Sequence, residues 1–343
     1  MNPKKWLLAF LLLSMILILS ISSFNYYIDP YGYQSRENKY IRNLSEISKT
    51  TILHNRIISD GYYYLIGTSR LVRLDPSFIE KVSSKKTHNI HIDGSTLKEN
   101  VLLAKYVKSK NKNFIYGFDA FSLNQSRLKH KEIQNRYETY KKELASNPNI
   151  FTKYFNSELL SVSLKHLKSE RKNRDYYDKF TIENNYTYNY SIQAVNKDKG
   201  YDNKQQKKNF SNFKSYPTEK IQELAHLATE DDIFIIYPKH YFHYKLFEKY
   251  QNINQQYLEA IKTLVENTNA RVWSFYEFNE ITMNTDNFDA YGWHFKPKIG
   301  KLIFARVFND PNVNVSDSFG VLLTKQNLDS YLMKIQNDLK RYH

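Results

Sequence analysis

The hydrophobic pattern divides the chain into an uninterrupted apolar segment at its start and a long remainder in which short apolar runs alternate with amphipathic ones. Residues 6–24 (WLLAFLLLSMILILSISSF) contain no charge and no proline. As a helix, this segment comes close to crossing a hydrocarbon core of ~30 Å, so it predicts a transmembrane anchor. Lys4 and Lys5 precede it, which predicts a cytoplasmic tip at residues 1–5 and places the rest of the chain outside the inner membrane.

A cleaved secretory signal is the alternative interpretation of this segment. Its apolar core lies at the long edge of the ~7–15 residues usual for a signal. No A-x-A cleavage site follows, although Ser20-Ile21-Ser22 is a weak substitute. We therefore favour an uncleaved anchor, and because no second run of ~18 apolar residues occurs, we expect the chain to span the membrane once.

The remainder of the chain predicts a layered α/β domain. A polar and aromatic stretch at residues 25–56 predicts a stalk, and five short apolar runs after it predict strands. These runs are residues 62–66, 87–92, 114–118, 233–237 and 271–275. Amphipathic helical patterns lie between several of them. Such alternation predicts a three-layer α/β sandwich with a mainly parallel central sheet, covered on both faces.

We predict the main domain at residues 57–310. One region inside it and one region after it depart from the alternation of strands and helices. Residues 128–216 are rich in Lys, Asn and Tyr and predict an insertion, either a helical cap or a loop. In α/β enzymes such insertions often cover the site. Residues 311–343 predict a C-terminal helical tail, in which the amphipathic pattern spans residues 327–342.

Composition narrows the classes of function. Of the 343 residues 41% are hydrophobic, and Lys+Arg (50) exceeds Asp+Glu (35), giving a net charge of +15. The apolar share argues against global disorder. The positive charge fits a solvated lysine-rich surface, or contact with anionic lipid headgroups or an acidic glycan. Absence of Cys excludes a disulfide scaffold and a cysteine nucleophile, and no nucleic-acid-binding signature is visible.

A candidate nucleophile follows the first predicted strand. Gly67 allows a sharp turn there, and Ser69 comes two residues later. In open α/β sheets ligands bind at the carboxyl ends of strands. The alternative is an ordinary turn in which Ser69 is only a helix N-cap.

A candidate base and acid lie on a polar loop after the last predicted strand, where Asp286, Asp289 and His294 occur within residues 286–297. A serine hydroxyl needs a base such as imidazole, and the imidazole needs an acceptor that fixes its tautomer. This loop supplies both kinds of group. The alternative is a surface loop with a solvated histidine.

Further polar residues follow other strands. The backbone amide of Gly94, after the second strand, or the segment ending at Asp119, after the third, can bind a developing oxyanion. Arg70 and Arg73 flank the serine and suit an anionic substrate such as a carboxylated sugar. Alternatively they pair with local acids such as Asp75.

Two histidines, His240 and His243, follow the most apolar predicted strand. No carboxylate or third histidine lies at ligand spacing, so we expect them to form a pocket wall rather than a metal site. No Walker loop or G-x-G-x-x-G motif is present, and we expect no cofactor.

The order of these blocks over residues 60–310 resembles the SGNH/GDSL hydrolase family. The likeness is closer to its membrane-anchored, envelope-facing branch, which includes the proteins for D-alanylation of teichoic acids and for alginate acetylation. The resemblance implies a flavodoxin-like SGNH fold with Ser69 as nucleophile, His294 as base and Asp289 as the orienting acid, with Asp286 as the alternative acid. It also implies an oxyanion hole that includes the Ser69 and Gly94 amides.

The chain departs from the family pattern at three places. Thr68 stands where the family has Asp, and the late acid and histidine are five residues apart instead of three. Asp119 replaces an asparagine whose amide donates to the oxyanion, and Asn124 is the substitute donor that we consider.

The resemblance implies a function as well. We expect a serine acyl esterase or O-acyltransferase, with O-acetyl as the first choice of acyl group, acting on a cell-envelope polysaccharide. A membrane-bound O-acyltransferase is the implied partner. The implied location is the bacterial inner membrane, with the domain on the periplasmic or extracytoplasmic side. The alternative is a non-catalytic anchored scaffold that binds such a partner or an acidic glycan.

Overall fold

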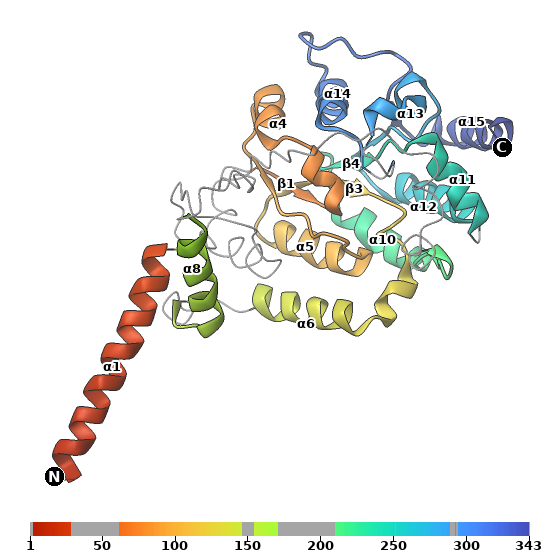
Figure 1. Cartoon of the computed structure of the whole chain (residues 1–343). Coiled ribbons are helices and arrows are strands. Elements are labelled where there is room, and N and C mark those ends of the chain that lie inside the picture. Colours follow the sequence, from red (N-terminus) through yellow and green to blue (C-terminus); the bar gives the residue numbers. More distant parts are fainter. Residues whose placement is uncertain are drawn as a thin grey trace. The chain divides into compact units, whose positions relative to one another are not determined.

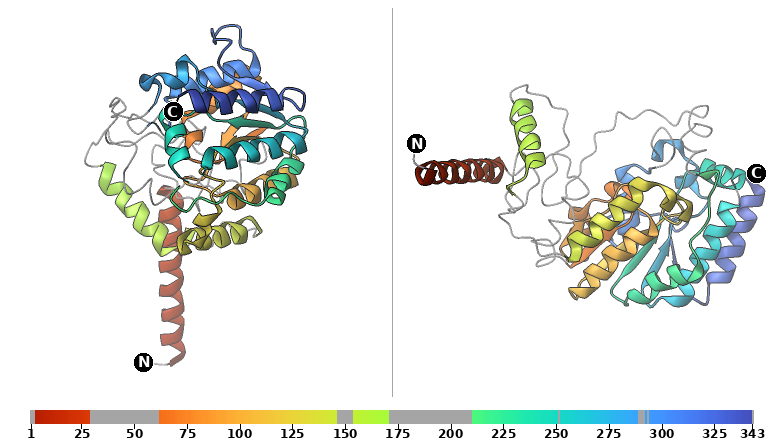
Figure 2. Two further views of the ribbon diagram at one scale, coloured as in Figure 1. Left: turned by 90° about the vertical axis from the view of Figure 1, so that its right-hand side faces the viewer. Right: turned by 90° about the horizontal axis from the view of Figure 1, so that it is seen from below.

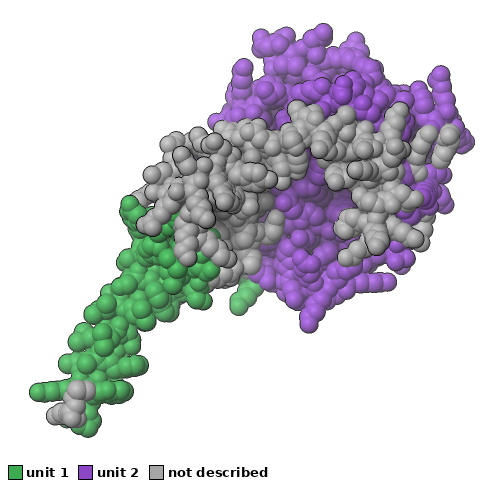
Figure 3. Space-filling view, in the orientation of Figure 1, with its two compact units in different colours: residues 1–56, 142–187 green, residues 57–141, 188–343 purple. Residues whose placement is uncertain are grey.

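The computed structural model of the chain describes residues 3–28, 62–145, 154–170, 210–250, 252–288, 292 and 294–342. The chain forms two compact units, coloured separately in Figure 3. Unit 1 comprises residues 1–56 and 142–187, and unit 2 comprises residues 57–141 and 188–343. Most of the predicted stalk lies outside the described residues.

Unit 1 contains the apolar helix α1 (Pro3–Ile28), which is long and apolar enough to cross a membrane. It includes the predicted anchor and extends it at both ends. Near its carboxyl end, the buried Asn25 side chain donates to the carbonyl of Tyr154 at 2.7 Å. It also accepts a hydrogen bond from the Ser163 hydroxyl at 3.0 Å, on helix α8 (Ser157–Glu170). The end of α1 is thereby attached to a helix from the predicted insertion.

Unit 2 is built on a six-stranded sheet in the order β2-β1-β3-β4-β5-β6. The strands are β1 (Tyr63–Ile66), β2 (Thr87–Asn89), β3 (Asn113–Phe118), β4 (Ile233–Ile236), β5 (Arg271–Ser274) and β6 (Val321–Leu323). The first five pair in parallel, and β6 joins β5 antiparallel. All five predicted strands are therefore present, and the α/β fold with a mainly parallel sheet is confirmed.

Strand β6 corrects the prediction that residues 311–343 are helical only. Helix α15 (Leu328–Arg341) lies close to the predicted span of 327–342, but the strand precedes it. β6 has only three residues and lies at the sheet edge, so it leaves no period long enough to detect in the sequence.

Helices cover both faces of the sheet, which explains why β1 and β4 are buried at every residue. On one face, Leu65, Ile115 and Ile235 belong to a core shared with α4 (Pro76–Ser83) and α14 (Pro297–Phe308). On the other face lie α5 (Leu97–Ser109), α10 (Thr218–Leu227) and α12 (Ile253–Asn267). Figure 1 shows α4 and α14 on one side of the sheet and α5 and α10 on the other.

The remaining elements connect this framework. They are η2 (Ser69–Arg73), η3 (Gln125–Lys129), α6 (Lys131–Ala145), α11 (Tyr241–Lys249), α13 (Glu280–Met283) and η4 (Thr285–Asn287). The predicted insertion at 128–216 supplies α6 and α8, and its residues 171–209 lie outside the described ones. Figures 1 and 2 show α6 running beside α5.

Candidate active site

Ser69 lies at the point where the strand order of the sheet reverses. β1 is flanked by β2 on one side and β3 on the other, and in such sheets ligands bind in the crevice outside the carboxyl ends of these strands. Gly67 makes the turn after β1 with φ +153°, a conformation that side chains rarely adopt. Thr68 occupies the cap of η2 and Ser69 is its first residue, so Ser69 is not the N-cap that the alternative interpretation required.

His294 lies within hydrogen-bond distance of Ser69. The Ser69 hydroxyl oxygen and His294 Nε2 are 3.0 Å apart, although 225 residues separate them in sequence. Both side chains are partly exposed, so the pair can be reached from solvent. This is the spacing that proton transfer from a serine nucleophile to a general base requires.

The core fixes both ends of the loop that carries His294. Phe288 and Phe295 form an isolated antiparallel bridge, and both side chains are fully buried. The Lys296 amide also donates to the carbonyl of Asn287 at 2.8 Å. Since Phe295 is the next residue after His294, the imidazole is attached to backbone that the core holds in place.

Of the two candidate acids, only Asp286 lies within the described residues. Asp289 lies outside the described residues. Asp286 is exposed in η4, where its backbone amide donates to the side-chain oxygen of the N-cap residue Asn284 at 2.8 Å. Among the interactions of the described residues, none joins Asp286 to His294, so the structure does not support Asp286 as the alternative acid of a triad.

Asp119 corrects the prediction that its segment donates to an oxyanion. Its carboxylate is fully buried and accepts hydrogen bonds from the Thr68 hydroxyl at 3.1 Å and from the Phe121 amide at 3.2 Å. It also forms ion pairs with Arg70 and, at 3.0 Å, with Lys239. Burial opposes its ionisation, but the two cations outweigh burial and hold the pKa of Asp119 well below its ordinary value. An ionised carboxylate has no proton to donate, so the side chain of Asp119 cannot serve as an oxyanion donor.

The same carboxylate holds the turn on both sides of the candidate nucleophile. Thr68 and Arg70 are the two neighbours of Ser69, and both bind Asp119 Oδ2. Fixing both neighbours restricts the backbone of Ser69 and the direction in which its hydroxyl leaves the chain. Asp119 is therefore a structural residue of the turn.

The arginines next to Ser69 are both buried. Arg70 is 4% exposed and paired with Asp119, and Arg73 is 5% exposed. Their predicted role in binding an anionic substrate stays a prediction. Asp75, the local acid considered as their partner, caps α4 by accepting the Ser77 amide at 3.0 Å.

Lys239 is the site residue that sequence analysis missed. It is 1% exposed, and burial and the nearby Arg70 lower its pKa to about 8 against the opposing attraction of Asp119. Its signal in the sequence is its place shortly after β4, where a charged side chain follows the most apolar strand after Tyr237 and Pro238. A charge at a strand's carboxyl end that must be buried predicts a buried partner of opposite sign.

Two backbone amides remain available near Ser69. The turn after β2 is attached to the turn after β1, because the Ile92 amide and the Ser95 hydroxyl both donate to the carbonyl of Gly67 at 3.0 Å. Within the described part of the chain, neither the Ser69 amide nor the Gly94 amide donates to a protein acceptor. Both amides therefore remain the candidate oxyanion donors, and their role stays a prediction.

Asn124 is buried and caps η3, with its side-chain oxygen accepting from the Ser126 amide at 3.1 Å and the Lys214 amide at 3.3 Å. These bonds engage the oxygen of the side chain, whereas an oxyanion donor would be its amide nitrogen. The role of Asn124 as the substitute donor therefore stays a prediction.

His240 and His243 are buried at the start of α11. The His240 ring packs against Phe288 at a centroid distance of 5.3 Å, behind the loop that carries His294. Its two nitrogens have no hydrogen-bond partner among the described residues, and burial lowers its pKa to about 4. No group of three or more metal-ligating side chains occurs in that part of the chain.

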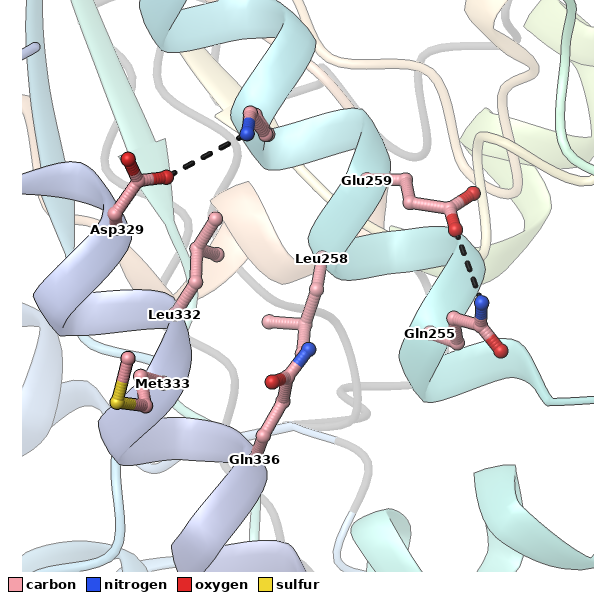
Figure 4. A pocket seen from close by; sticks show the side chains of 8 residues that line it. Gln255, Leu258, Glu259, Asp329, Leu332, Met333 and Gln336 are labelled. Carbon is pink, nitrogen blue, oxygen red and sulfur yellow. Dashed lines mark hydrogen bonds and ion pairs between the residues drawn. The ribbon is translucent and has the colours of Figure 1, made fainter.

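A shallow depression elsewhere on unit 2 lies between α12 and α15 (Figure 4). Its apolar floor includes Leu258, Leu332 and Met333, and ion pairs such as Lys262 with Asp329 at 3.5 Å cross its rim. None of the predicted site residues lines it, so it has no part in the candidate chemistry.

Neither a scan against protein-family models nor a search of curated proteins finds a match for this chain. The geometry around Ser69 and His294 therefore has to support a function by itself.

Replacing Asp119 with Asn should destabilise unit 2 strongly, because Arg70 and Lys239 would remain buried without a counter-charge. We expect the free energy of unfolding to fall by about 3–5 kcal/mol, measured by denaturant titration of the detergent-solubilised chain. Asp286→Asn, at an exposed carboxylate, is the control and should change it by less than about 0.5 kcal/mol. Equal stability of the two variants would contradict the structural role of Asp119.

His240 should make the fold sensitive to acid. Its pKa is about 4 in the folded chain against 6.5 ordinarily, so between these values the unfolded chain binds a proton that the folded chain does not. The contribution of neutral His240 to the free energy of unfolding is fully present above pH 6.5. This contribution is lost as the pH falls toward 4. We expect His240→Phe to show a smaller drop in Tm than the parent between about pH 7 and about pH 4.5, whereas exposed His226→Gln should match the parent. An equal drop in all three would refute this.

Proposed function

We propose that the protein is a membrane-anchored serine acyl esterase or O-acyltransferase that acts on a cell-envelope polysaccharide. The observation that carries this proposal is the 3.0 Å separation of the Ser69 hydroxyl and His294 Nε2. The parallel strands follow the order 2-1-3-4-5, which is the order of flavodoxin-like folds. This order supports the resemblance to SGNH hydrolases and a reaction at the crevice beside β1.

The chemistry proceeds in two halves. Ser69 Oγ attacks the carbonyl carbon of an ester while His294 Nε2 takes the hydroxyl proton, and the carbonyl oxygen becomes an oxyanion facing the Ser69 and Gly94 amides. The bond from that carbon to the alcohol oxygen then breaks, and His294 returns the proton to the leaving alcohol. The acyl group is now bound to Ser69.

In the second half an incoming hydroxyl attacks the acyl-serine, and His294 takes its proton and delivers it to Ser69 Oγ as the serine leaves. Water as the incoming group yields a carboxylic acid, which is hydrolysis. A sugar hydroxyl yields a new ester, which is transfer. The family resemblance assigns Asp289 as the acid that orients His294.

Helix α1 supports work close to a membrane surface, because it is apolar over a length that can cross a bilayer. With Lys4 and Lys5 on the cytoplasmic side, unit 2 lies on the periplasmic or extracytoplasmic side of a bacterial inner membrane, where envelope polysaccharides are accessible. A membrane-bound O-acyltransferase is the partner that would deliver acyl groups there.

A non-catalytic scaffold is the second candidate, and one observation favours it. The family places an amide donor where this chain has Asp119, and that carboxylate is committed to Arg70 and Lys239. A scaffold performs no acyl transfer and would need no oxyanion donor. It would instead bind a membrane partner or an acidic glycan through its excess of lysine and arginine side chains.

A fluorophosphonate probe separates the two functions, because it reacts only with an activated serine. We expect the full chain in detergent to be labelled, Ser69→Ala to show no labelling, and His294→Gln to react at least ~100-fold more slowly. His226→Gln, at an exposed histidine of α10, should match the parent. Absence of labelling in the parent chain, with salt-sensitive binding of an acidic glycan, would establish the scaffold instead.

The polysaccharide is tested separately in cells. Replacing the native protein by Ser69→Ala should change the ester content of the envelope glycan, downward for a transferase and upward for an esterase, measured by alkaline release of the acyl groups. An unchanged ester content together with efficient labelling in vitro would retain the serine enzyme and remove the polysaccharide as its substrate.

A further inference from the structure

The turn after β2 carries one of the two amides available for an oxyanion, and it is held by an unusual number of cationic contacts. We define residues 92–95 as the oxyanion turn. Gly94 at its centre has φ +60°, and the side chains of Arg127 and Arg136 both donate to its carbonyl oxygen, at 2.5 Å and 3.1 Å. Two guanidinium groups on one carbonyl restrain this peptide more than a single neutral hydrogen bond would.

Arg136, on helix α6, donates to the oxyanion turn with both of its terminal nitrogens. Besides the Gly94 carbonyl, it donates to the carbonyl of Asp93 at 3.2 Å. The same guanidinium forms a two-point ion pair with Glu99, at 2.6 Å and 3.0 Å. Glu99 is fully buried and also accepts from the Thr96 amide at 2.8 Å in the capping box of α5. The guanidinium is thus fixed against α5 before it reaches the turn.

The contact with Asp93 determines where the Gly94 amide points. The Asp93 carbonyl and the Gly94 N–H belong to one planar trans peptide, in which the two groups point in opposite directions. A guanidinium that holds the carbonyl toward α6 therefore directs the N–H away from α6. The attachment of the turn to the Gly67 carbonyl, through Ile92 and Ser95, brings that peptide beside the turn that carries Ser69.

Arg127 holds the other half of the oxyanion turn. It donates to the carbonyl of Ser95 at 3.2 Å, and its guanidinium stacks on the Phe121 ring at 3.9 Å from the centroid. Burial, and then repulsion from Arg136, lower its pKa to about 10. Bringing two like charges together disfavours folding, with Glu99 as the nearby compensating charge, so the arrangement is costly for a turn that only connects a strand to a helix.

We propose that Arg136, together with Arg127, is a positioning residue that aims the Gly94 amide at the oxyanion of the acyl-transfer transition state. This inference rests on the proposed function. It gives the inserted helix α6 a direct part in the reaction, because α6 supplies the guanidinium that orients the donor. The effect belongs to the transition state, since the amide faces a charge that exists only there.

Arg306 provides a matched control. It lies on α14 and its side chain is 23% exposed, against 22% for Arg136. It also holds a loop by its carbonyls, donating to Phe319 at 3.0 Å and Val315 at 3.3 Å. That loop contains none of the candidate site residues, so loss of Arg306 should loosen the fold without moving the oxyanion turn.

The experiment compares Arg136→Met, Arg136→Lys and Arg306→Met in the full chain, with a nitrophenyl acetate ester at a temperature well below each Tm. We expect kcat to fall about 10- to 100-fold in Arg136→Met with less than about twofold change in KM. Arg136→Lys keeps the charge without the planar fork and should recover only part of kcat. Arg306→Met should retain the parental kcat.

A boronic acid supplies a readout that general loosening would not move. It forms a tetrahedral adduct on Ser69 with a boron-bound oxygen directed at the amides, so its affinity should fall in Arg136→Met by the same factor as kcat. The inference is overturned if kcat and boronate affinity are unchanged in both Arg136 variants, or if Arg306→Met loses as much as Arg136→Met. If the parent chain neither reacts with the fluorophosphonate nor cleaves the ester, the proposed function fails first and this inference with it.

Discussion

The arrangement at the crevice depends on one buried carboxylate, that of Asp119. An unpaired carboxylate buried here would destabilise the fold. Arg70, which follows β1, and Lys239, which follows β4, pair with it and make its ionised form the stable one. Because the residues before and after Ser69 both bind it, the serine hydroxyl has little freedom of direction. Asp119 thus contributes to the rigidity of the turn that carries Ser69.

In the proposed reaction, this ionised carboxylate leaves the backbone amides of Ser69 and Gly94 as the candidate donors to the oxyanion. Backbone donors need no side-chain rotamer, but they act only if their peptides are held in the correct plane. In our proposal, the guanidinium groups of Arg127 and Arg136 around the turn after β2 meet that requirement.

The fold was largely readable from the sequence, whereas the polar interior was not. β1 and β4 are buried at every residue and appear in the sequence as plain apolar runs, and the order of motifs placed Ser69 and His294 together, as the structure has them. The ion pairs of Asp119 with Arg70 and Lys239 were not predicted, because the three residues follow different strands and Lys239 is 120 residues from Asp119 in the chain. Ion pairs between residues so far apart in the sequence leave no periodic pattern by which they could be predicted. β6 was missed because three residues are too few to show alternation.

The distance along the chain between the hydroxyl and the imidazole has a consequence for biosynthesis. The serine follows the first strand of the sheet, while the histidine follows the last parallel one. A nascent polypeptide therefore lacks the pairing of hydroxyl and imidazole until almost all of the sheet has been synthesised and has docked. Under the proposed function, products terminated before His294 would lack the proton acceptor and could not cleave esters through Ser69.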